Sequence, residues 1–202
     1  GKGNDNDAKL FVTILKYLET PQYFRRHIFG RTNLLKFAGV LTPLKIPNQT
    51  GTSNPKELKT NDIREGLVVR VNGQKGIDLG INQIISHHSK HDVGKRILVK
   101  IKTPFPDFTV KEITKQEISG YWSYSVKQSG NLFALLSSWA GIKILTSRKA
   151  KNLNKLHIDE LKKSKKPILL VFGSTTKGIH DILGNKINNI QNSKTLNFFP
   201  NQ

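Results

Sequence analysis

The stretch PILLVFGSTTKG, residues 167–178, joins a nearly continuous apolar run to a glycine-containing turn. A short apolar run bounded by proline and glycine is typical of a strand buried on both faces of a parallel sheet. Open α/β sheets bind ligands at the carboxyl ends of their strands, where a residue such as Gly173 lets a ligand approach the backbone. The stretch thus predicts a binding loop, although a turn that merely requires glycine fits equally well. It is not a Walker A loop, because Lys177 is followed by Gly178.

The flanking residues repeat the same alternation of strand and helix. We expect helices over 131–141, 152–166 and 176–183, and strands over 142–147, 167–173 and 195–199. This β-α-β-α-β order predicts a parallel sheet with helices on its faces. Two further strands end in polar residues, so three strand-end loops would converge on one pocket if the strands are neighbours. The residues concerned are Thr146, Ser147 and Arg148 after one strand and Pro200, Asn201 and Gln202 after the other.

The first half of the chain has a different pattern. A helix is expected from Asp7, which would serve as its N-cap, and shorter helices are expected at 22–29 and 32–39. Residues 40–65 contain three prolines and read as a connection between domains. Short alternating strands follow at 67–79, as a hairpin, and at 96–101 and 108–113, and they predict a small barrel. Residues 121–126, YWSYSV, read as one more strand.

Charge and composition narrow the classes of function. Lys and Arg number 33 against 14 Asp and Glu, a net charge of +19, which favours a polyanionic partner, with RNA or DNA first. The chain has no cysteine, so it has no disulfide, thiolate zinc ligand or cysteine nucleophile. No serine-histidine-acid order or convincing carboxylate pair stands out, and His87, His88 and His91 fit a solvated hairpin tip better than a metal site. No apolar run approaches the length of a membrane helix, so we expect a cytoplasmic protein without membrane or metal partners.

Several clusters could contact nucleic acid. Tyr23, Arg25, Arg26 and Arg31 form an aromatic-basic group suited to phosphate and base contacts, although an amphipathic helix with Phe24 in the core fits equally. The barrel adds basic residues, with two phenylalanines that could stack on bases or cap the barrel core. The lysines at 162–166 read as a solvated helix end, with phosphate contact as the alternative. The basic barrel residues include Arg70, Lys95, Arg96 and Lys100.

Several phrases together resemble the archaeal and eukaryotic SPOUT (α/β-knot) RNA methyltransferases that carry an OB-fold insertion. They are LETPQYFRRHIF at 18–29, LKFAGVLTPLKIP ending at Pro47, GYWSYSV at 120–126, ILTSRKA at 144–150 and VFGSTTKGIHDIL at 171–183. The similarity follows the same order over nearly the whole chain. The resemblance implies an α/β fold, a trefoil-knotted parallel sheet formed by residues 1–42 and 119–202, with an OB-like β-barrel inserted at 43–118. It also implies a homodimer, and further segments before and after the residues printed here.

The resemblance further implies a cofactor, S-adenosylmethionine, bound in the knot. Carried over to matching positions, its site comprises Thr146, Ser147, Arg148, Gly173, Ser174, Gly178, Phe199, Pro200, Asn201 and Gln202. Arg25 and Arg26 would be the catalytic residues, facing RNA or the reacting base. The implied reaction is methylation of a base, a uridine ring nitrogen, in ribosomal RNA. The alternative is a non-catalytic RNA-binding or ribosome-assembly protein on the same scaffold.

Overall fold

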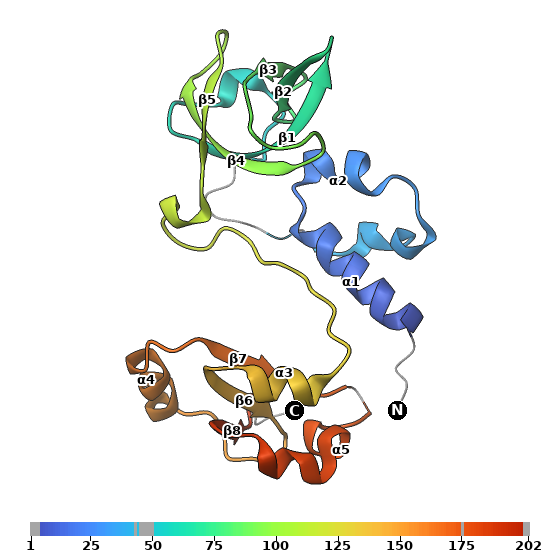
Figure 1. Cartoon of the computed structure of the whole chain (residues 1–202), viewed down its shortest axis with the longest axis vertical. Coiled ribbons are helices and arrows are strands. Elements are labelled where there is room, and N and C mark those ends of the chain that lie inside the picture. The colour runs from blue at the N-terminus through green and yellow to red at the C-terminus, as the bar shows by residue number, and fades with distance from the viewer. Residues whose placement is uncertain (1–4, 43, 45–50, 175, 200–202) are drawn as a thin grey trace. The chain divides into compact units, whose positions relative to one another are not determined.

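The computed structural model describes residues 5–42, 44, 51–174 and 176–199 of the chain. The chain divides into two compact units, residues 1–128 and 129–202. Each unit has its own sheet: five antiparallel strands in the first and three parallel strands in the second (Figure 1). The predicted mixture of helices with a parallel sheet is therefore confirmed. The predicted grouping of residues 1–42 with 119–202 in one discontinuous domain stays a prediction.

The first unit begins with helices α1 (Asp5–Glu19) and α2 (Gln22–Phe29). Asp7 is not the N-cap, because the helix already includes Asp5; both acids lie in its first turn, where they complement the helix dipole. Pro21 separates the two helices, and Phe24 of α2 is completely buried. Three short 3-10 helices follow, at Asn33–Leu35, Ala38–Val40 and Pro55–Glu57.

The antiparallel sheet has the strand order β3-β2-β1-β4-β5. Its bounds are β1 Ile63–Val71, β2 Gln74–Asp78, β3 Ile84–Ser86, β4 Arg96–Thr103 and β5 Thr109–Ile113, followed by a 3-10 helix at Lys115–Glu117. The predicted hairpin is confirmed: Asn72 and Gly73, with φ of 49° and 82°, turn β1 into β2. The apolar interior includes Val68, Ile77 and Val99.

The strands of the predicted small barrel do not close among the described residues, because β3 and β5 each pair with only one neighbour. The sheet nevertheless curls strongly in Figure 1. His87, just after β3, lies 3.1 Å from the Glu112 carboxylate on β5, so side chains join the two edges where backbone pairing does not. The result is a curled open sheet.

Residues 121–126 do not form the predicted strand; they have no regular secondary structure. Their aromatic side chains explain the alternating pattern in another way. Trp122 packs with Leu98 and Ile118 on the outer face of the sheet, and the Tyr124 hydroxyl donates to the Leu15 carbonyl at 2.7 Å. The segment is therefore held by its side chains instead of by a backbone ladder.

The second unit is a parallel sheet of order β7-β6-β8. Its elements are α3 (Leu132–Ser138), β6 (Ile142–Thr146), α4 (Lys155–Lys163), β7 (Ile168–Val171), α5 (Ile179–Leu183), a 3-10 helix (Gly184–Asn189) and β8 (Ser193–Leu196). Leu136 of α3 and Ile179 and Leu183 of α5 pack with Leu145 and Val171 on one face. Lys194 pairs in register with Ile144, and its ammonium binds Glu160 of α4 at 2.6 Å, so α4 lies on the opposite face.

This arrangement confirms the predicted order of strands and helices from residue 131 onward. No helix in the described parts of the chain has both the length and the apolar character that crossing a membrane requires.

Candidate functional site

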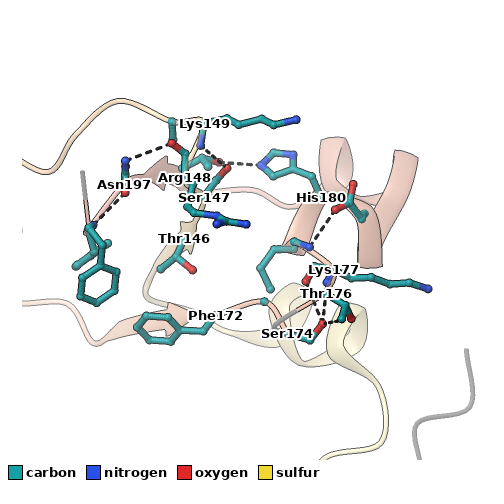
Figure 2. A pocket seen from close by; sticks show the side chains of 18 residues that line it. Thr146, Ser147, Arg148, Lys149, Phe172, Ser174, Thr176, Lys177, His180 and Asn197 are labelled. Atoms are coloured by element: carbon teal, nitrogen blue, oxygen red, sulfur yellow. Dashed lines mark hydrogen bonds between the residues drawn. The ribbon is translucent and has the colours of Figure 1, made fainter. Parts of the chain in front are cut away.

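The three parallel strands end around one cavity of about 890 Å³ in the second unit (Figure 2). Its walls come from the ends of β6, β7 and β8 and the segments that follow them, so the predicted meeting of the loops after β6 and β7 at one cavity is confirmed. Pro200, Asn201 and Gln202 lie outside the described residues. The predicted residues that line the cavity are Thr146, Ser147, Arg148, Gly173, Ser174, Gly178 and Phe199.

The loop between β7 and α5 is held closed by its own hydrogen bonds. The Ser174 amide donates to the Lys177 carbonyl at 2.9 Å, and the Lys177 amide donates to the Ser174 hydroxyl at 2.9 Å. A Cβ atom at Gly173 would lie 2.7 Å from the Lys177 carbonyl oxygen. Since that neighbour is backbone, the loop can close this tightly only with glycine at 173. Asp181 accepts from the Gly178 amide at 3.0 Å and fixes the far end of the loop.

Asn197 ties the other two loops together, and sequence reasoning missed it. It is 7% exposed, its side-chain amide donates to the Arg148 carbonyl at 3.3 Å, and its oxygen accepts from the Phe199 amide at 3.0 Å. On the next wall, the Thr146 hydroxyl donates to the Val171 carbonyl at 3.0 Å and joins the ends of β6 and β7. A single asparagine after a short strand offers no local signal for joining two loops, because Arg148 lies 49 residues away in the chain.

The cavity offers aromatic and charged groups to a ligand. Phe172 and Phe199 are 58% and 54% exposed at its wall, unusual for phenylalanine and suited to stacking on a flat ring. Cationic lining side chains outnumber the one acid, Asp181, and favour a ligand with an anionic group. His180 reaches in from α5, with its Nε2 3.5 Å from the Thr195 hydroxyl (Figure 2). The cations are Arg148, Lys149 and Lys177, and in Figure 2 Lys177 runs outward, away from Thr146 and Ser147.

The two predicted catalytic arginines have different surroundings in the first unit. The Arg25 guanidinium donates to the Thr20 carbonyl at 3.0 Å and to the Leu18 carbonyl at 3.3 Å, and it stacks over the Tyr17 ring at 4.5 Å. It therefore caps the carboxyl end of α1, whose last carbonyls lack helical partners. Arg26 is exposed on α2. Of the two, Arg26 is the one placed to reach an external ligand.

Arg96, predicted to bind RNA, is engaged in a partly buried ion-pair network. Its guanidinium makes two hydrogen bonds with Glu19, at 2.8 and 3.1 Å, and also binds Glu65. Burial raises the pKa of Glu65 above 4.5, and Arg96 only partly offsets this. Burial alone would lower the pKa of Arg96, but its bonds to the two carboxylates raise it above the usual value. The indole of Trp122 completes the network by donating to Glu65 at 3.2 Å.

Tyr23, also predicted to bind RNA, is half-buried against a second arginine. Its hydroxyl donates to the Glu65 carbonyl at 3.1 Å, and the buried guanidinium of Arg64 lies 4.3 Å from its ring. Arg64 in turn donates to the Leu79 carbonyl at 2.7 Å, and burial lowers its pKa. Tyr23 and Arg64 thus hold α2 against the sheet, a role that no local sequence pattern predicted.

The other predicted RNA contacts lie at or near the surface of the first unit. Arg31, Arg70 and Lys95 are exposed, and Lys100 is half-buried. Of the three histidines at the predicted hairpin tip, His88 and His91 are exposed as expected and His87 is half-buried. His87 and His91 both face Glu112. Over the described residues, no three acidic, histidine or cysteine side chains are grouped to hold a metal ion.

Comparison with known proteins agrees with this geometry. A family model described as "Putative RNA methyltransferase" matches residues 1–202. The chain is 26% identical to an uncharacterised protein of Halobacterium salinarum over 91% of its own length. It is 28% identical to the 28S rRNA (uridine-N(3))-methyltransferase of Mus musculus over 61% of its length. It is 30% identical over 79% of its length to a Caenorhabditis elegans protein named as a methyltransferase.

These relatives are longer than this chain. The chain spans 65% of the Halobacterium protein, 45% of the nematode protein and 34% of the mouse enzyme. The family model, in contrast, matches the chain from its first residue to its last. Together with a parallel sheet whose strand ends enclose a cavity, this match establishes that the chain belongs to the family of RNA methyltransferases that the model describes.

Proposed function

We propose that this protein transfers a methyl group from S-adenosylmethionine to a uridine ring nitrogen in ribosomal RNA. The observation that carries the proposal is the cavity at the carboxyl ends of β6, β7 and β8, where the loops expected to bind the cofactor meet. Membership of an RNA methyltransferase family and the named activity of the mouse relative support the reaction and the substrate. The net charge of +19 supports an RNA partner.

The residues of the cavity fit such a cofactor. Gly173 lets the loop after β7 close against the Lys177 carbonyl and so shapes one wall of the cavity, and the aromatic rings of Phe172 and Phe199 suit a purine. Thr146, Ser147 and Arg148 offer groups for ribose hydroxyls and a carboxylate. When bound, S-adenosylmethionine would supply a methyl group on a sulfonium, and the carbon–sulfur bond would break to a neutral thioether as the ring nitrogen bonds the methyl carbon.

Arg26 is the residue we assign to the reacting base. A uridine ring nitrogen is a poor nucleophile until it loses its proton to water, and a fixed cation nearby favours the resulting anion. Arg26 is exposed, whereas Arg25 already binds two carbonyls. In this proposal Arg25 acts indirectly, by fixing the end of α1 from which α2 and Arg26 follow.

The proposal includes a trefoil knot, an OB-like insertion and a homodimer. The curled sheet, with His87 and Glu112 bridging its edges, supports the OB-like architecture. Ile168 and Leu170 on the edge strand β7 are 42% and 45% exposed, and this apolar edge supports burial against a second copy. The cytoplasmic location expected from the sequence remains part of the same proposal.

The test has two measurements on the whole gene product. Calorimetry with S-adenosylmethionine measures cofactor binding, and labelled methyl transfer to undermethylated total RNA, followed by nuclease digestion, locates the product. Label in one ribosomal uridine is the expected result. Binding without any label in RNA would mean that the substrate class is wrong. If the protein neither binds the cofactor nor labels RNA, the result would favour the alternative, a non-catalytic RNA-binding protein on the same scaffold.

A further inference from the structure

A strongly basic segment begins at the cavity, just after β6, and continues through α4. Residues 148–166, which we call the α4 ridge, contain eight Lys and Arg side chains against two acids. All eight cations are exposed. They are Arg148, Lys149, Lys151, Lys155, Lys162, Lys163, Lys165 and Lys166.

The acids do little to cancel this charge. Glu160 binds the Lys194 ammonium at 2.6 Å, which lowers the pKa of Glu160 and pairs its charge with a lysine outside the ridge. Asp159 is half-buried. The exposed surface of the ridge is therefore dominated by positive charge.

Helix stability explains only one end of the ridge. Lys162 and Lys163 lie in the last turn of α4, where cations complement the helix dipole. Lys155 lies in the first turn, and Lys149 and Lys151 precede it, where the dipole disfavours cations. Positive charge at both ends of the helix therefore requires another reason.

The ridge is continuous with the candidate cofactor cavity. Arg148 and Lys149 line the cavity, and the Leu153 amide donates to the Asn197 carbonyl at 2.7 Å, which places the start of α4 beside the carboxyl ends of the strands. The helix then runs to the amino end of β7, over about 13 Å for nine residues. This length matches several phosphates of a nucleic-acid strand, which follow one another every ~3.4 Å along a duplex.

We propose that the α4 ridge is a phosphate-binding track that holds the RNA backbone on the way to the cavity. The inference rests on the proposed function, since it assumes that RNA is the substrate. Lysines on a flexible stem suit such contacts, because they bind phosphates as point charges without reading sequence. The ridge thus contributes affinity and salt dependence, and base selection belongs to other residues.

The test uses Lys162→Gln/Lys163→Gln in the full chain, with Lys9→Gln/Lys16→Gln as the matched control. Both pairs are exposed lysines on helices, and both changes remove two charges. Affinity for a fluorescein-labelled RNA hairpin is measured by anisotropy at several salt concentrations, without methyl donor. We expect roughly tenfold weaker binding and a salt slope reduced by about 1.5 for the ridge variant, and little change for the control.

Equal effects of the two variants would overturn the track, because the loss would then reflect net charge alone. Unchanged RNA affinity of the ridge variant, together with lost binding to phosphatidylserine vesicles, would also overturn it and assign the ridge to a lipid surface. If the wild type methylates RNA and the ridge variant binds RNA normally, the track is refuted and the proposed function stands. Ridge-dependent RNA binding without any methyl transfer by the wild type keeps the track and refutes the enzyme.

Discussion

The two units use the same types of basic residue differently, buried with partners in one and exposed to solvent in the other. The first unit draws arginines into its interior, where Arg64 is completely buried against carbonyls and Arg96 is shared between two carboxylates. The second unit leaves eight cations of one segment in solvent and directs Arg148 to a cavity. Arg64 and Arg96 therefore fix the fold of the first unit, whereas the eight cations of the α4 ridge stay available for a ligand. Residue type alone does not separate the two roles; burial and partners do.

The largest expected effect comes from Arg96→Leu. It leaves the buried carboxylate of Glu65 without its cation, so we expect the first unit to lose about 3 kcal/mol of unfolding free energy. Each unit contains one tryptophan, Trp122 and Trp139, so denaturant unfolding followed in Trp139→Phe reports the first unit alone. Lys95→Leu, at an exposed neighbouring position, is the control and should change little. An equally mild effect of Arg96→Leu would show that the network does not hold this unit.

Gly173→Val tests the proposed ligand-binding role of the second unit, in contrast to the structural role of Arg96 in the first. The new side chain would meet the Lys177 carbonyl and displace the loop, so we expect loss of S-adenosylmethionine binding and a roughly hundredfold slower methyl transfer. Gly130→Val is the matched control, because nothing lies within 4 Å of a Cβ there. Calorimetry and circular dichroism check affinity and folding together. Normal cofactor affinity in folded Gly173→Val would remove this loop from the site.

The pair Arg25→Gln and Arg26→Gln separates a structural from a functional arginine. Loss of the Arg25 bonds to two carbonyls should cost about 1 kcal/mol of stability. Arg26→Gln should leave stability unchanged and slow methyl transfer without changing cofactor affinity. Thermal melting and single-turnover transfer rates distinguish the two. If Arg26→Gln transfers methyl groups at the normal rate, its assigned role is wrong.

The smallest effect concerns the pH dependence of the first unit. Because burial raises the pKa of Glu65, the folded chain binds a proton there at a pH where the unfolded chain does not. This contribution to stability is complete below pH 4.5 and is lost as the pH rises through the raised pKa. Relative to Glu65→Gln, the wild type should therefore gain stability as the pH falls from 7.5 towards 4.5. Melting curves of both proteins across this range test it; a constant difference would contradict a raised pKa.

Much of the second unit could be predicted from sequence because its signals are local. The apolar run at 167–171 and the glycine after it define β7 and its loop within a few residues. The strand predicted at 121–126 was wrong because the signals there are not local. The sequence does alternate, but the side chains of Trp122 and Tyr124 bind distant groups while the backbone pairs with no strand. Asn197 was missed because two of its partners, Arg148 and Asn152, lie 49 and 45 residues away in the chain.

The sequence by itself determined the order of helices and strands from residue 131 onward, the hairpin turn at Asn72–Gly73 and the strong positive charge, since these follow from periodicity, turn chemistry and composition. Only the tertiary structure decided which cations are structural. Arg96 meets Glu65 from 31 residues away and Glu19 from 77 residues away. With 33 cations in the chain, only packing brings particular carboxylates and carbonyls to Arg25, Arg64 and Arg96 and leaves Arg26 and the α4 ridge in solvent.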